Sequence, residues 1–184
     1  MTDHELAALL ASEAGRLLLD VRTEFADASA EDRKAAGDKR SHDFLMAALA
    51  AERPGDAVLS EEGVDDPVRL SAQRVWIVDP LDGTREFSEL DRTDWAVHVA
   101  LVINEAPVAG AVALPGLGVT LHTGDAPALP TSGAPTPRMI VSRSRPPVAA
   151  LRLAEALGAD LVEMGSAGAK TMAVVRGECE IYAH

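Results

Sequence analysis

A short apolar run followed by closely spaced acidic residues, Val75 to Phe87, constrains the fold of this chain more than any other stretch. Its first four residues, Val-Trp-Ile-Val, are too few for a helix and include β-branched side chains, so they predict a buried strand. Pro80 has no amide hydrogen to donate to a sheet and is expected to end that strand. Asp79 and Asp82 then lie just past the carboxyl end of the strand, around a tight Pro-Leu-Asp-Gly turn.

These two aspartates are expected to face one small volume, with the N–H groups of Gly83 and Thr84 beside them. Two ionised carboxylates about 4 Å apart repel by roughly 1 kcal/mol in water and by about 4 kcal/mol at an effective dielectric near 20. A divalent cation between them reverses the sign of that interaction, and hard oxygen ligands suit Mg²⁺ rather than zinc. The alternative is an ordinary Asp-Gly turn in which Asp79 points into water.

The composition limits the classes of partner. The 184 residues, 47% of them hydrophobic, fit about one domain with its own core. Lys and Arg number 17 against 29 Asp and Glu, and the net charge of -12 argues against a nucleic acid polymer or an anionic membrane as partner. The single cysteine, Cys179, and the lack of an apolar run of about 20 residues predict a cytoplasmic protein.

Before the central stretch, the sequence predicts two helices and a strand. A capping box at Thr2 to Glu5 begins the first helix, residues 26–36 are expected to form a loop, and the second helix starts at Asp38. Asp38 fits an ordinary helix-start residue as well as a functional one. A strand at 57–59 is followed by two glutamates, which are either a solvated acidic turn or ligands delivered to the rim that holds Asp79.

After the central stretch, strands and helices alternate in the α/β manner. Residues 123–137, rich in Pro, Gly, Ala and Thr, are predicted to form a loop or linker between an N-terminal metal- and phosphate-binding subdomain (1–122) and a C-terminal α/β subdomain (138–184). Strands are expected at 96–103, 108–114, 119–121, 139–141, 161–162 and 180–182, and helices at 148–157 and 170–175.

The sequence argues against two other kinds of site, a P-loop and a histidine metal site. The stretch from Gly165 to Thr171 is not a P-loop, because Ala169 replaces the glycine before the lysine and Met164 replaces the leading glycine. The five histidines show no pairwise spacing typical of a metal site and are expected at the surface or satisfied in the core: His4, His42, His98, His122 and His184.

The acidic motifs resemble those of a known family. Ser60-Glu61-Glu62, followed by Trp76 to Thr84, resembles the metal-binding signature of the inositol monophosphatase superfamily of Mg²⁺-dependent, lithium-sensitive phosphatases. The stretches Asp82 to Phe87, Val141 to Ser144, and Gly165-Ser166 with Lys170 are similar to those of the CysQ-type 3'(2'),5'-bisphosphate nucleotidases. The resemblance runs from about Leu6 to the last residue and implies an αβαβα sandwich.

The resemblance also implies a role for each matching residue. The metal ligands would be Glu61, Asp79, Asp82 and the backbone carbonyl of Leu81. Asp38 and Thr84 would orient and deprotonate the attacking water, with the acidic Glu62 close to a third metal position. The substrate would be bound by Gly83, Thr84, Ser142, Arg143, Ser166, Lys170 and His184.

The implied activity is Mg²⁺-dependent hydrolysis of the 3'-phosphate of 3'-phosphoadenosine 5'-phosphate by a cytoplasmic enzyme, with a homodimer as one expected assembly. The family's Trp-Asp segment, whose aspartate ligates the second metal, is expected after Tyr182-Ala183-His184, and the sequence stops before it. Three alternatives therefore stay open: inositol monophosphatase activity, fructose bisphosphatase activity, and a binding remnant with impaired catalysis.

Overall fold

The computed structural model describes residues 1–131 and 135–183, which form helices that alternate with the strands of two sheets. The helices are α1 (Asp3–Glu24), α2 (Ala30–Glu52), α3 (Thr84–Ser88), α4 (Val148–Leu157) and α5 (Ala167–Val175). The larger sheet contains, in spatial order, β1 (Ala57–Ser60), β2 (Arg74–Asp82), β3 (Ala96–Ile103), β4 (Ala106–Leu114) and β5 (Val119–His122). The smaller sheet has the order β7 (Asp160–Met164), β6 (Arg138–Ser142), β8 (Ile181–Tyr182).

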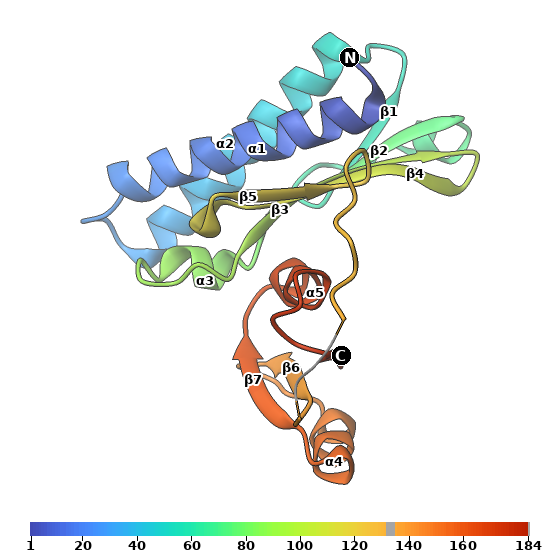
Figure 1. Cartoon of the computed structure of the whole chain (residues 1–184). Coiled ribbons are helices and arrows are strands. Elements are labelled where there is room, and N and C mark those ends of the chain that lie inside the picture. Colours follow the sequence, from blue (N-terminus) through green and yellow to red (C-terminus); the bar gives the residue numbers. More distant parts are fainter. Residues whose placement is uncertain (132–134, 184) are drawn as a thin grey trace.

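These elements are stacked in layers (Figure 1). Helices α1 and α2 cover one face of the larger sheet, and α5 lies between the two sheets. Helix α4 packs on the outer face of the smaller sheet, where Ala150 and Ala154 contact Met139 and Val141 of β6. The layer order is α-β-α-β-α, as the family resemblance implies.

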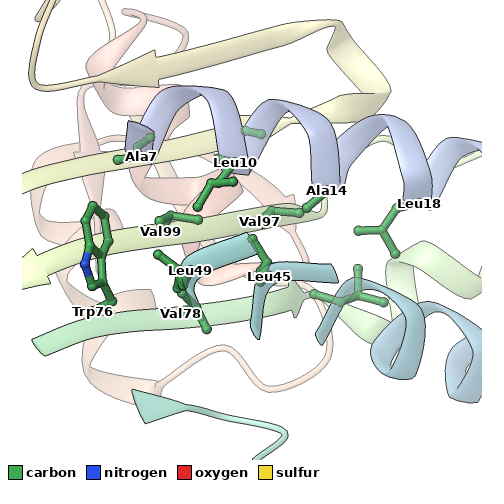
Figure 2. Close-up of a cluster of buried hydrophobic side chains, with 14 of the residues drawn as sticks. Ala7, Leu10, Ala14, Leu18, Leu45, Leu49, Trp76, Val78, Val97 and Val99 are labelled. Carbon is green, nitrogen blue, oxygen red and sulfur yellow. The ribbon is translucent and has the colours of Figure 1, made fainter. Parts of the chain in front are cut away.

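The main core lies between α1, α2 and the larger sheet. Figure 2 shows the inward-facing side chains of this core, which include Ala7, Leu10, Ala14, Leu18, Leu45, Leu49, Trp76, Val78, Val97 and Val99. Each fully buried large side chain contributes roughly 1.5–3 kcal/mol. Because successive residues of a strand point to opposite faces, Asp79 and His98 lie on the other face of the sheet, toward α5. The hydrophobic alternation of β2 and β3 thereby places the site.

Helix α2 begins at Ala30, well before Asp38, so the predicted loop of residues 26–36 is wrong over most of its length. The side chain of Ser29 caps the helix by accepting from the N–H of Asp32 at 3.0 Å. One turn later, the guanidinium of Arg33 is buried and donates to a group of backbone carbonyls, those of Phe25, Ala26, Ala28 and Ser88. These polar bonds, rather than an apolar stripe, hold the first turns of the helix.

Replacing Arg33 with methionine keeps much of the apolar stem but leaves these carbonyls without their donor. We expect the free energy of unfolding to fall by roughly 3 kcal/mol, because buried acceptors lose hydrogen bonds to a charged group. Urea denaturation measures the change. In the control Lys39→Met, on the exposed side of the same helix, the ion pair with Asp43 is solvated and we expect a change below about 0.5 kcal/mol. Equal effects of the two substitutions would contradict the role given to Arg33.

Strand β2 continues through Pro80 to Asp82, so the prediction that Pro80 ends the strand is wrong. On one side, β1 pairs with β2 only as far as Val78. On the other side, the pairing of β2 with β3 shifts register between Asp79 and Asp82. An irregular register next to an unpaired edge accommodates a residue that has no N–H to donate. The two aspartates therefore lie on a distorted strand and not around a turn.

Two connections complete the fold. Strands β3 and β4 are joined by a two-residue turn, shorter than the predicted four, because Asn104 and Glu105 both adopt positive φ (48° and 66°) as in tight hairpins. The segment 123–137 links the two sheets, and its residues 132–134 lie outside the described part of the chain. The division into two subdomains stays a prediction. None of the helices in the described residues is both long enough and apolar enough to cross a membrane.

Candidate active site

The carboxyl ends of β1 and β2 place acidic residues at one edge of the larger sheet. The two strands are parallel, with Ser60 opposite Val78. Glu61 follows β1 directly, and its N–H donates to the carbonyl of Val78 at 3.2 Å, beside Asp79. Parallel strands deliver their ends to the same rim, so Glu61 and Asp79 meet there as the sequence predicts.

Asp79 is at the centre of this acidic edge. Burial raises the pKa of its carboxyl to about 7, and the negative charges of Asp82 and Glu61 act in the same direction. A side-chain contact with Glu61 raises this pKa further. Asp79 Oδ1 also accepts from the N–H of Leu81 at 3.1 Å. Ionised carboxylates gathered in this way repel one another, and a bound cation would remove that repulsion.

Asp82 accepts hydrogen bonds from two elements that are distant in sequence. Its Oδ2 accepts from the hydroxyl of Ser166 at 2.7 Å and from the N–H of Gly168 at 2.6 Å, and it lies 3.0 Å from Nε2 of His98. Burial alone would raise the pKa of Asp82, but these hydrogen bonds and the nearby His98 hold it below its usual range. Asp82 is thus ionised under conditions in which Asp79 retains a proton.

His98 belongs to the site, contrary to the prediction that it is a surface or core histidine. It lies directly opposite Asp79 in the ladder between β2 and β3. One ligand atom from each of Asp79, Asp82 and His98 lies within 4.8 Å of the other two. Burial lowers the pKa of the imidazole, but its hydrogen bond with Asp82 and the surrounding carboxylates raise it overall. Histidine spacing along the chain could not reveal this; pairing the two strands by their alternation could.

Asp38 reaches the same edge from α2. Burial and the charges of Glu62 and Glu61 raise the pKa of Asp38 to about 6, against a hydrogen bond with Thr84 that lowers it. Its Oδ1 is buried and has no hydrogen-bond partner among the described residues. The hydroxyl of Thr84 also lies 3.2 Å from the carbonyl oxygen of Leu81. The structure therefore brings the residues predicted for metal binding and for water activation into one neighbourhood.

These residues fit a divalent cation. The raised pKa of Asp79 beside Asp82 and Glu61 and the unpaired buried oxygen of Asp38 both indicate carboxylate charge that the described side chains do not neutralise. The available donors are carboxylate oxygens and the carbonyl of Leu81, which suit a hard ion such as Mg²⁺. A nitrogen donor, His98, lies at the same cluster, and nitrogen is more typical of transition-metal sites. The donor set supports a divalent metal site without fixing the metal.

A pocket of about 680 Å³ opens beside the acidic edge. Four of the predicted substrate-binding residues line it: Gly83, Thr84, Ser142 and Lys170. The pocket brings together the start of α3 and the end of β6, so both sheets contribute to it. Its other lining residues include Arg85, which lies within the motif from Asp82 to Phe87, and Arg145, which directly follows the motif from Val141 to Ser144; neither is among the predicted substrate-binding residues.

Gly83 is required at its position for two reasons. Its φ of +88° is in the left-handed region, which side chains rarely adopt. A Cβ atom there would also lie 2.9 Å from the Cβ of Ser166. The absence of a side chain lets α5 approach the end of β2 and leaves room for the adjoining pocket.

Arg143, a predicted substrate residue, is paired with two carboxylates of the protein. Its guanidinium donates to Glu86 at 2.6 Å and to Glu89 at 2.7 Å, and it does not line the pocket. These two carboxylates raise the pKa of Arg143, and Glu86 is itself buried. The pairs hold the end of β6 against α3 and so help to assemble the pocket, while a substrate contact of Arg143 stays a prediction.

Ser166 is a predicted substrate residue that does not line the pocket. The hydroxyl of Ser166 donates to Asp82 and accepts from the N–H of Ala169 at 2.9 Å, so it caps α5 and orients a carboxylate. His184 lies outside the described residues. Lys170 does line the pocket, and its Nζ donates to the carbonyl of Gly165 at 2.6 Å.

Comparisons with known proteins place these features among phosphatases. The profile of the inositol monophosphatase family matches residues 3–184. The 3'-phosphoadenosine 5'-phosphate phosphatase of Mycobacterium leprae is 47% identical over 200 residues, which cover 100% of this chain and 72% of that protein. Among solved structures, CysQ from Bacteroides thetaiotaomicron superposes with a TM-score of 0.74 at 26% identity, over 96% of this chain and 78% of that one. Inositol monophosphatase II from Staphylococcus aureus gives 0.77 at 24% identity, over 94% and 71%, and supports the fold alone.

Proposed function

Because this chain belongs to the inositol monophosphatase family, we propose that it is a Mg²⁺-dependent phosphatase that hydrolyses 3'-phosphoadenosine 5'-phosphate to AMP and phosphate. The observation that carries the proposal is the convergence of Glu61, Asp79 and Asp82 beside a pocket lined by cationic side chains. The motif resemblance to CysQ-type nucleotidases and the name of the Mycobacterium leprae relative support this substrate. The buried free thiol of Cys179 is in keeping with the cytoplasmic location that we also propose.

The chain's own residues account for binding and for movement of the proton. Glu61, Asp79, Asp82 and the carbonyl of Leu81 would hold the metal, which when bound neutralises phosphate oxygens and makes a water molecule more acidic. Asp38, with a pKa of about 6, is mainly ionised at neutral pH and can accept a proton. The hydroxyl of Thr84 donates to Asp38 while accepting from water, so the pair acts as a general base although an alcohol alone is a poor one.

The pocket suits a substrate with more than one phosphate. Arg85, Arg145 and Lys170 line it in a protein whose net charge is -12, so positive charge is gathered where an anion would bind. Arg85 also pairs with Glu89 at 3.3 Å, and Lys170 is held by a backbone carbonyl. The exposed Arg145 has no ion pair within the described residues. We propose that Arg145 contacts the 5'-phosphate while Gly83 and Thr84 face the 3'-phosphate.

Replacing Arg145 with alanine is therefore expected to reduce selectivity for 3'-phosphoadenosine 5'-phosphate over 3'-AMP by roughly 10-fold, because one charge-assisted contact is lost. The ratio of kcat/KM for the two substrates is the measurement. Arg152→Ala, an exposed arginine on α4, is the matched control and should leave the ratio unchanged. An equal loss on both substrates in the Arg145 variant would contradict this assignment.

Phosphate release from 3'-phosphoadenosine 5'-phosphate, inositol 1-phosphate and fructose 1,6-bisphosphate, measured side by side, tests the function. We expect the first to be hydrolysed fastest with MgCl₂, release to stop with EDTA, and millimolar lithium to inhibit. Faster release from either of the other two would overturn the proposed substrate. No release from any of them by folded, Mg²⁺-binding protein would overturn the proposed reaction.

A further inference from the structure

We propose that His98 is a positioning residue: it holds one oxygen of Asp82 so that the other stays available to a metal ion. This inference rests on the proposed metal site at Asp79 and Asp82 and not on the identity of the substrate. In the ladder between β2 and β3, His98 lies opposite Asp79. From that position the imidazole reaches past Asp79 to Asp82, and Nε2 lies 3.0 Å from Oδ2.

The two oxygens of Asp82 have unequal partners. Oδ2 has His98, the hydroxyl of Ser166 at 2.7 Å and the N–H of Gly168 at 2.6 Å. Oδ1 accepts only a longer bond, 3.3 Å, from the N–H of Ala167 among the bonds of the described residues. A carboxylate oxygen with three donors has little capacity left for a cation, whereas Oδ1 has. The donors on Oδ2 therefore decide which oxygen of Asp82 is the ligand.

The backbone of α5 is shaped around this contact. A Cβ atom on Gly168 would lie 2.2 Å from Nε2 of His98 and 2.9 Å from Oδ2 of Asp82. Neither contact is tolerable, so a glycine is needed where the helix passes over the histidine and aspartate. Gly168 thus permits the imidazole, the carboxylate and the first turn of α5 to meet at one point.

The other side of the imidazole faces an apolar pocket. His98 also lines an apolar pocket of about 300 Å³, together with Ala100, Val112 and Met172. The ring is therefore held from the side of the acidic edge, by its hydrogen bond with Asp82 and by the close passage of the α5 backbone at Gly168. A side chain held in this way can orient a ligand, as groups that hydrogen-bond to metal ligands commonly do.

The test is the dissociation constant for Mg²⁺, measured by titration calorimetry on the full chain without substrate. His98→Leu fills the space without a donor, and we expect Mg²⁺ affinity to fall 10- to 100-fold, the range typical of losing a group that orients a ligand. His98→Gln keeps an N–H donor and should restore most of the affinity. His122→Leu, a histidine lining the same apolar pocket, is the control and should bind Mg²⁺ as the unsubstituted protein does.

Steady-state kinetics add a second readout. With His98→Leu, the Mg²⁺ concentration for half-maximal rate should rise, while the rate at saturating Mg²⁺ changes little. Unchanged Mg²⁺ affinity in His98→Leu, or equal losses in the Leu and Gln variants, would overturn the inference. Should His98→Leu not fold, His98→Ala takes its place under the same criteria. Because affinity is measured without substrate, failure of the proposed reaction leaves this test intact.

Discussion

Asp79→Asn is expected to lower kcat/KM by roughly 1,000-fold or more, because it removes the carboxylate that lies between Glu61 and Asp82 and with it several kcal/mol of charge stabilisation through the metal. The substitution keeps the shape of the side chain and its capacity to accept from the N–H of Leu81. Phosphate release at saturating MgCl₂ measures the loss. Asp20→Asn, an exposed residue of α1, is the matched control and should retain full activity.

The same substitution should stabilise the metal-free protein at alkaline pH. Burial and two neighbouring carboxylates make an ionised Asp79 unfavourable, whereas an amide carries no charge. Asp79→Asn should therefore unfold at a higher temperature than the unsubstituted protein when both are in EDTA near pH 8. A loss of activity accompanied by a lower unfolding temperature would mean that the variant is misfolded, and the role of Asp79 would then lack support.

The second large effect is on stability as a function of pH. The folded-state pKa values of Asp79 (about 7) and Asp38 (about 6) are both raised above the ordinary 3.8. A raised carboxyl pKa means that the folded state binds protons more tightly, so its contribution to stability is complete below about pH 4 and is lost as pH rises through 6 to 7. Differences of about three pKa units for Asp79 and two for Asp38 correspond to roughly 7 kcal/mol at most. Because both carboxylates are only partly buried and solvent screens their charges, we expect metal-free protein to lose roughly half of that, about 2–4 kcal/mol, between about pH 4 and pH 8.

Mg²⁺ should reverse this loss, because it binds the deprotonated carboxylates. The rise in unfolding temperature on adding MgCl₂ is therefore expected to be larger near pH 8 than near pH 5. Scanning calorimetry with MgCl₂ or EDTA at both pH values measures the four midpoints. In Asp79→Asn the difference between the two pH values should shrink. An equal Mg²⁺ effect at both pH values would show that these carboxylates are not the groups to which the ion binds.

Much of the site could be predicted because its key residues are close in sequence to strands with a clear hydrophobic pattern. The apolar run from Val75 to Val78 located β2, and the acidic residues after β1 and β2 then had to meet at one edge. The motif resemblance supplied the roles of Asp38 and Thr84, which periodicity alone could not. The limits of α4 were also predicted, because its apolar pattern and flanking residues are local signals.

The errors arose where partners are distant in the chain. The early start of α2 depends on Arg33 bonding to Ser88, a residue of α3. The pairing of Arg143 with Glu86 joins residues 57 positions apart and leaves no local signal, so the sequence does not predict it. The place of His98 at the site is missed for the same reason, because it follows from the register between β2 and β3, which puts His98 opposite Asp79. A proline is predicted to end a strand, but Pro80 continues β2 because β1 does not pair with β2 beyond Val78, and the sequence carries no signal of that unpaired edge.

Anomalous diffraction from crystals grown with Mn²⁺ tests the central claim most directly, since Mn²⁺ accepts the same oxygen ligands as Mg²⁺. The claim is that Glu61, Asp79 and Asp82 together bind the divalent ion required for phosphate hydrolysis. We expect an anomalous peak bounded by these three side chains and the carbonyl of Leu81, and no such peak in Asp79→Asn crystals. Mn²⁺ bound only elsewhere, at a concentration that supports full phosphate release, would contradict the account.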